Sequence, residues 1–269
     1  MKPKKMKHLI GSTIKKIYQP FALATAKYRP LPDFVIIGAS RSGTTHLFHT
    51  LEQHPQIVRS RKKELHFFDK NENYVRGINY YKSSFPLSFN LPDDALVVEA
   101  TPAYIYSAQA SVRLKKHLPN VKLILLLRNP IQRAISSYFN GKRKGYEPRT
   151  IDEVFINNPT LIHEDYIQKG IYIDQIQRYE KYLSEGNLLI LQSEELFNNK
   201  SKVLKDVEKY LNVDAKLEFA KNVTKHEVKR NEKVSKEIYA VLDQIFDPYN
   251  KRLYAYLEKD FDWVKPDNL

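Results

Sequence analysis

The 269-residue chain contains no cysteine. Disulfide bonds, thiolate metal sites and a cysteine nucleophile are therefore excluded, and the absence fits a reducing compartment. Long apolar runs are also missing. None approaches the roughly 20 residues that span a bilayer, and there is no uninterrupted signal-type core. We therefore expect a cytoplasmic protein, with membrane association left open.

The composition is that of an ordinary globular protein. Hydrophobic residues make up 42% of the chain and charged residues 28%, which argues against a disordered or fibrous chain. No internal repeat, low-complexity tract or linker divides it, and the length suits a single α/β domain. We expect a helical basic segment at 1–30 followed by one domain at 31–269.

Positive charge is concentrated at the N-terminus. The chain carries 44 Lys and Arg against 31 Asp and Glu, a net charge of +13, and residues 1–30 supply eight cations and no acid. The remainder is only mildly basic, so nucleic acid is not an expected partner. Apolar side chains in this segment recur at the spacing of one helical face, which suits either peripheral membrane contact or a helix packed on its own domain; they are Ile10, Ile14, Ile17 and Phe21.

Short apolar runs alternate with segments of helical pattern along the rest of the chain. The runs are 34–37, 95–98, 121–127 and 188–191, and the helical segments lie near 46–52, 103–117, 131–140, 163–183 and 194–211. This alternation predicts an α/β fold with a central parallel sheet flanked by helices. Sites in such sheets lie beyond the carboxyl ends of the strands, so residues 38–45, 99–102 and 128–130 are the informative ones.

The first of these segments has the spacing of a phosphate-binding loop. Gly38 and Gly43 are separated as in G-x-x-x-x-G, where backbone N–H groups and a helix N-terminus hold an anion. The lysine that reaches the phosphates of a nucleoside triphosphate is missing, which disfavours ATP. A smaller anion would be held by one cation and three hydroxyls, namely Arg41, Ser42, Thr44 and Thr45.

A second anion site is predicted after the apolar run that ends at Leu127. Asn129 is a natural N-cap and Pro130 a natural first helical residue, so a helix begins directly after Arg128. Ser136 lies about two turns into that helix. Arg128 and Ser136 together suit a second phosphate, although an arginine in this position also suits a surface ion pair.

With these segments combined, the chain from Phe34 to Trp263 resembles the sulfotransferase superfamily, and within it the heparan sulfate N- and 3-O-sulfotransferase branch. The matching stretches are Ser40 to Thr45 with His54 and Pro55, Lys63 to Asp69, Glu99 to Tyr104, Leu127 to Tyr138, Pro248 to Tyr254, and Asp262 with Trp263. The resemblance implies a P-loop-like three-layer fold.

The resemblance also implies 3′-phosphoadenosine 5′-phosphosulfate (PAPS) as sulfuryl donor and 3′-phosphoadenosine 5′-phosphate (PAP) as product, with no required metal. Residues 41–45 would hold the 5′-phosphosulfate, and Arg128 and Ser136 the 3′-phosphate. Tyr172 lies in a segment that resembles one near the nucleotide. A basic loop that closes over the nucleotide in the family would correspond here to Lys225, Lys229 and Arg230.

The resemblance places the acid–base chemistry on Glu64. As general base it would take the proton of the acceptor hydroxyl or amine, unless it serves only as an ion-pair partner of Lys62 or Lys63. His66 would face the same side in an extended stretch and orient Glu64 or the acceptor, or act as an ordinary hydrogen-bonded histidine. Arg41 would stabilise the oxygen that leaves with the nucleotide.

Two positions depart from the family pattern. Arg41 stands where lysine is usual, which replaces a point charge with a planar fork. Ala100 stands where the animal enzymes have a lysine. The expected acceptor is a saccharide, but heparan sulfate itself does not follow. Protein tyrosine, lipid and small natural product stay open, as do a P-loop nucleotide kinase or other phosphotransferase and a non-enzymatic polyanion-binding protein.

Overall fold

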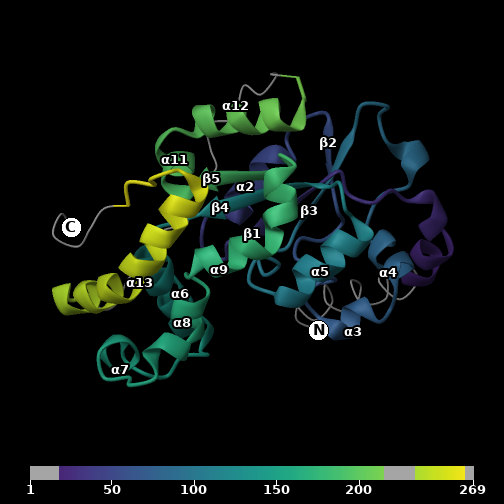
Figure 1. Ribbon diagram of the computed structural model, residues 1–269. Helices are drawn as coiled ribbons and strands as arrows, with labels where there is room; N and C mark the ends of the chain where they lie inside the picture. The colour runs from purple at the N-terminus through teal and green to yellow at the C-terminus, as the bar shows by residue number, and fades with distance from the viewer. Residues whose placement is uncertain (1–17, 215–233, 264–269) are drawn as a thin grey trace, which may run out of the picture.

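The computed structural model describes residues 18–214 and 234–263, which form a layered α/β architecture (Figure 1). Its sheet has the strand order β2-β3-β1-β4-β5, and every strand pair is parallel. The strands are β1 Phe34–Gly38, β2 Ile57–Arg59, β3 Leu96–Ala100, β4 Lys122–Leu127 and β5 Leu188–Gln192. The predicted central parallel sheet is therefore confirmed.

Helices cover both faces of the sheet. The reason is that the strands are largely apolar and successive side chains point to opposite faces, so both faces must be covered. In β1, Val35 and Ile37 pack into one hydrophobic core, while Phe34 and Ile36 pack into another on the opposite face. The second core is closed by α2 Thr44–Leu51, α11 Ser193–Asn198 and α12 Lys200–Leu211. Of these helices, α11 and α12 lie above the sheet in Figure 1.

The first core is the larger one and lies under the remaining long helices. It is closed mainly by α5 Ala108–His117, α6 Pro130–Lys144, α9 Tyr172–Ile176, α10 Glu180–Ser184 and α13 Lys236–Leu257. The other short helices are α3 Asn71–Tyr74, α4 Ile78–Lys82, α7 Ile151–Phe155, α8 Asp165–Gln168, and the 3₁₀ turns η1 Ala26–Tyr28, η2 Ser88–Asn90, η3 Leu161–His163 and η4 Gln177–Tyr179.

Several boundaries differ from those predicted. Strand β2 was not anticipated because it has only three residues and lies at a sheet edge. The helical segment near 163–183 is divided into α8, α9, η4 and α10. The segment near 194–211 is broken at Asn199, whose side chain accepts a hydrogen bond from the Lys202 N–H and so caps α12.

The described part of the N-terminal segment packs on the domain. Residues 18–24 are helical, and Ala22 and Ala26 are buried, whereas Phe21 is 53% exposed. The guanidinium of buried Arg29 donates to the carbonyl of Phe85. Ile10, Ile14 and Ile17 lie outside the described residues. Within the described part of the chain, no helix is both long and apolar enough to cross a membrane.

Candidate active site

The predicted phosphate loop connects β1 to α2 at the carboxyl edge of the sheet. Gly43 caps α2 with a φ of 89°, a left-handed conformation that favours glycine. A Cβ there would also lie 3.1 Å from the Phe197 ring. Ser42 and Thr44 are buried. Glycine therefore allows the tight turn that leads into α2, and the N-terminus of this eight-residue helix faces the interior of the loop.

Arg41 and Arg128, expected at the two ends of one ligand, lie in direct contact. Arg128 Nη1 donates to the carbonyl oxygen of Arg41 over 3.1 Å. The Arg41 guanidinium in turn donates to Ser136 Oγ, over 3.3 Å from Nε and 3.2 Å from Nη2. The structure therefore brings these three predicted residues together, with Arg41 directed toward the hydroxyl predicted to bind the 3′-phosphate.

Helix α6 and its cap fix this cluster. The Asn129 side chain accepts hydrogen bonds from the N–H groups of Ile131 and Gln132, and Pro130 is the first helical residue, as predicted. Tyr172 is buried and its hydroxyl donates to the carbonyl of Arg128 over 2.9 Å. Tyr172 is thus connected to the site by holding the Arg128 backbone.

The cluster is strongly electropositive. Burial, together with the nearby charges of Arg128 and Arg143, lowers the pKa of Arg41. Arg133, one turn along α6, is fully buried, and desolvation lowers its pKa too. Guanidinium groups gathered in this way repel one another, and an anion bound between them relieves the repulsion.

Glu64, His66 and Asp69 form a second group of site residues. His66 Nδ1 lies 2.7 Å from Asp69 Oδ2, and His66 Nε2 lies 3.8 Å from Glu64 Oε2. Lys63 Nζ donates to Glu64 Oε1 over 2.7 Å, so the anticipated ion pair with Lys63 is present. The histidine and the lysine lower the pKa of Glu64 to about 2, while Asp69 and then Glu64 raise the pKa of His66 to about 9.

The stretch around Glu64 is not extended, so the condition on which His66 was expected to face the same side is not met, although His66 Nε2 does lie toward Glu64. Glu64 has a φ of 61° and His66 a φ of 51°, and Glu64 N–H donates to the carbonyl of Ala100 over 2.8 Å. Arg41 is also left-handed, with a φ of 71°. The three predicted catalytic residues thus share a backbone conformation that is sparsely populated outside glycine, as strained residues at functional sites often do.

A buried carboxyl lies near this group, in the segment 99–102 that the sequence marked as informative but to which it gave no residue role. Glu99, at the end of β3, is fully buried and accepts a hydrogen bond from the Thr101 hydroxyl. Desolvation raises its pKa to about 7. The neighbouring Ala100 is also fully buried. Because its side chain is a methyl group, this position supplies no cation to the site.

An aromatic pair beside the loop was also missed. The rings of His46 and Phe197 lie 5.5 Å apart at the start of α2 and in α11, and Phe197 is 38% exposed. Only the packing of α11 against the loop brings these two residues together. A sequence signal existed only for His46, which directly follows the hydroxyl pair Thr44 and Thr45.

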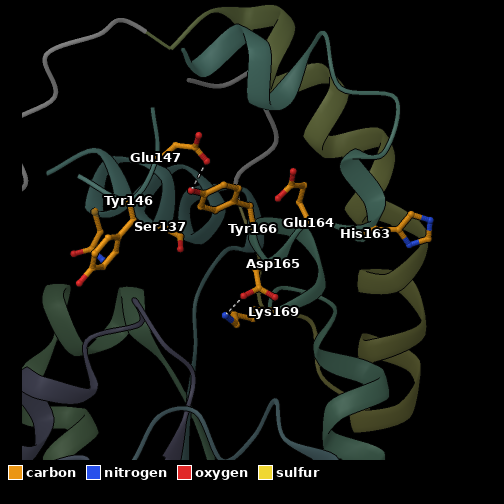
Figure 2. A pocket seen from close by; sticks show the side chains of 10 residues that line it. Ser137, Tyr146, Glu147, His163, Glu164, Asp165, Tyr166 and Lys169 are labelled. Carbon is orange, nitrogen blue, oxygen red and sulfur yellow. Dashed lines mark hydrogen bonds and ion pairs between the residues drawn. The ribbon is translucent and has the colours of Figure 1, made fainter. Parts of the chain in front are cut away.

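A cavity of about 510 Å³ adjoins the cluster on the side of α6 and α8 (Figure 2). Its wall includes Asn140, whose side-chain oxygen accepts from Arg41 Nη1 over 3.5 Å. The predicted nucleotide-closing residues Lys225, Lys229 and Arg230 lie outside the described residues.

A family model described as "Sulfotransferase domain" matches residues 31–252. Heparan sulfate glucosamine 3-O-sulfotransferase 5 of Mus musculus is 26% identical over 260 residues, covering 87% of this chain and 74% of that protein. Membrane-associated sulfotransferase kil1 of Dictyostelium discoideum is 44% identical over 108 residues, covering 40% of this chain and 22% of kil1.

A sulfotransferase from Alicyclobacillus acidocaldarius has a TM-score of 0.73 at 24% identity, covering 86% of this chain and 98% of that one. This likeness shows that the two chains share their fold.

Proposed function

The chain belongs to the sulfotransferase domain family and is a PAPS-dependent sulfotransferase, and we propose that it transfers the sulfuryl group to a saccharide with Glu64 as general base. The observation that supports the donor site is the hydrogen-bonded cluster of Arg41, Arg128 and Ser136, and the contact of Glu64 with His66 supports the base. The cluster combines two cations and a hydroxyl at the mouth of a glycine loop.

The cluster fits a donor with two anionic ends. Loop N–H groups at the start of α2, together with Thr44 and Thr45, would hold the 5′-phosphosulfate. Arg128 and Ser136 would hold the 3′-phosphate through charge-assisted hydrogen bonds. Arg41 now contacts Ser136, so stabilising the leaving oxygen requires its guanidinium to turn away from that hydroxyl toward the loop.

The adenine ring of the donor needs an apolar surface near the loop. His46 and Phe197 provide one, because their rings are adjacent and Phe197 is partly exposed beside Gly43. Stacking of a nucleobase on such aromatic rings contributes about 1–3 kcal/mol. We assign the adenine to this surface.

The proposed transfer step needs only the donor, the acceptor and two residues of this chain. The acceptor oxygen or nitrogen forms a bond to sulfur, the bond between sulfur and the bridging phosphate oxygen breaks, and PAP leaves. Glu64 takes the acceptor proton, and Arg41 stabilises the charge that develops on the departing oxygen.

A saccharide acceptor is supported by the relatives whose names specify heparan sulfate glucosamine. The kil1 relative is membrane-associated by name, which is compatible with membrane contact through the basic residues 1–30. That contact and the cytoplasmic location stay predictions.

The test is the Glu64→Gln variant with ³⁵S-labelled PAPS and a panel of saccharide acceptors. We expect PAP to bind with the wild-type affinity, measured by calorimetry, and transfer to fall by about 10²–10⁴-fold. Glu52→Gln is the matched control, because Glu52 pairs with Arg59 at the surface. Wild-type turnover by Glu64→Gln would remove Glu64 as the base.

A further inference from the structure

The segment that carries the proposed base is held by the end of a neighbouring strand. Two of its backbone N–H groups donate to residues at the end of β3. The N–H of Glu64 donates to the carbonyl of Ala100 over 2.8 Å, and the N–H of His66 donates to Thr101 Oγ1 over 3.4 Å. The backbone on both sides of Leu65 is therefore tied to β3 and the residue that follows it.

Further contacts restrain the same segment. Asn73 Nδ2, in α3, donates to the carbonyl oxygens of Leu65 over 3.4 Å and of His66 over 2.8 Å. The N–H of Phe67 donates to the hydroxyl of buried Tyr104 over 3.1 Å. Left-handed φ angles outside glycine are energetically unfavourable and persist only where the surrounding structure over-determines the backbone. These contacts supply that restraint for the two left-handed residues of the segment.

Glu99 sets the direction in which the Thr101 hydroxyl points. A threonine hydroxyl has one hydrogen and two lone pairs. Thr101 donates its hydrogen to Glu99 Oε1, so its lone pairs remain to accept from the N–H of His66. Without this acceptor the hydroxyl is free to turn toward Tyr104, with which it also interacts. The Glu99 carboxyl therefore fixes the hydrogen bond that restrains His66.

The folding stability of the protein does not by itself account for a carboxyl at this position. Glu99 is fully buried, and its Oε2 has no hydrogen-bond partner among the described residues. A buried polar atom left unpaired costs free energy. Burial raises the pKa of Glu99, and the Thr101 hydroxyl and the Leu65 N–H oppose that rise. Both groups that favour the carboxylate thus lie in, or hold, the segment of the proposed base.

Resting on the proposed function, in which Glu64 is the base, we propose that Glu99 is a positioning residue for the transfer reaction. By fixing the Thr101 hydroxyl it holds the backbone of His66, and so keeps the imidazole between Asp69 and Glu64. The role needs a hydrogen-bond acceptor on the side chain but no negative charge. A glutamine therefore serves at this position, and a leucine does not.

The first test follows the His66 imidazole by NMR titration of the full chain, with its signals identified by their absence in His66→Asn. The wild-type imidazole should titrate near pH 9, because Asp69 and then Glu64 raise its pKa to about 9. Glu99→Leu removes the acceptor, so the imidazole moves away from these carboxylates and its midpoint should fall by about 1 pH unit or more. Glu99→Gln should stay within about 0.5 pH units of the wild type.

Activity supplies the second test, with ³⁵S-labelled PAPS and the same panel of saccharide acceptors. Glu99→Leu should lower kcat by about 10–100-fold through misplacement of the base, while PAP binds with the wild-type affinity by calorimetry, and Glu99→Gln should restore kcat. Thr101→Val should cause the same loss, with no further loss in the double variant. Thr50→Val is the matched control, since Thr50 is a buried threonine whose hydroxyl has no partner among the described residues.

The outcomes separate the two claims. Wild-type turnover by Glu64→Gln removes the base, and with it this role for Glu99. Loss of transfer in Glu64→Gln, together with a Glu99→Leu variant that matches the wild type in its His66 titration or in kcat, overturns the positioning claim alone. A Glu99→Gln variant as impaired as Glu99→Leu also overturns it. If the wild type sulfates no saccharide of the panel, the saccharide proposal fails, and the NMR titration decides the role of Glu99.

Discussion

Arg128 donates a hydrogen bond from its guanidinium to the backbone carbonyl of Arg41. The end of β4 is thereby tied to the loop that follows β1, its neighbour in the sheet. Because Arg41 has a left-handed φ, its carbonyl points where an ordinary loop residue would not direct it. The contact brings the two predicted anion sites next to each other, so a ligand with two anionic ends can engage both.

The aromatic pair at the edge of the loop gives the first prediction. Phe197→Ala removes one ring of the proposed adenine surface, and we expect PAP affinity to fall by roughly five- to a hundredfold, the range for a lost stacking contact. Inorganic pyrophosphate, which has no base, should bind both proteins equally. Calorimetric titration checks both ligands, and an unchanged affinity for PAP would assign the base elsewhere.

The pH dependence of transfer gives the second prediction. Glu64, with a pKa near 2, is a weak base while protonated His66 and Lys63 hold it. Asp69 and Glu64 raise the pKa of His66 to about 9, so His66 stays charged until alkaline pH. We expect kcat/KM to rise with pH toward a midpoint near 9, as loss of the His66 proton frees Glu64 to accept one.

The Asp69→Asn variant tests the origin of that midpoint. It removes the largest cause of the raised histidine pKa, so the midpoint should move down toward the ordinary histidine value of about 6.5. A profile that is flat in the wild type, or a midpoint that Asp69→Asn leaves in place, would show that His66 does not control the base.

The dependence of folding stability on pH gives the third prediction. Burial raises the pKa of Glu99 to about 7 in the folded protein from 4.5. The folded state therefore holds this proton more tightly, and the stabilisation is complete below pH 4.5 and is lost as pH rises through 7. Thermal unfolding of Glu99→Gln should show a smaller fall in Tm between pH 5 and 7 than the wild type.

His66 provides the comparison for that experiment. Its raised pKa stabilises the fold below pH 6.5, and this contribution is lost as pH rises through 9. His66→Asn should therefore flatten the fall in Tm above pH 6.5, and Glu99→Gln the fall below it. Equal slopes in wild type and Glu99→Gln between pH 5 and 7 would contradict a proton on Glu99.

The sequence was most informative where local signals are strong. The buried strands have unbroken apolar runs such as 123–127, and Asn129 with Pro130 begins a helix through local capping alone. Arg41, Arg128 and Ser136 could be placed in one region because parallel strands end at the same edge.

What the sequence did not reveal depends on packing between distant segments. Phe197 reaches His46 only because α11 folds over the loop, and the raised pKa of Glu99 follows from its complete burial. Left-handed φ angles at Glu64 and His66 carry no glycine or asparagine signal.

The most direct test of the two-ended donor site compares PAP with adenosine 5′-phosphate, which lacks the 3′-phosphate, on wild type and on Arg128→Ala by calorimetry. Arg59→Ala serves as the control because Arg59 pairs with Glu52 on the surface. We expect the wild type to prefer PAP, and Arg128→Ala to weaken PAP by about ten- to a hundredfold while adenosine 5′-phosphate binds as before. Equal loss for both nucleotides, or no loss for either, would contradict the account.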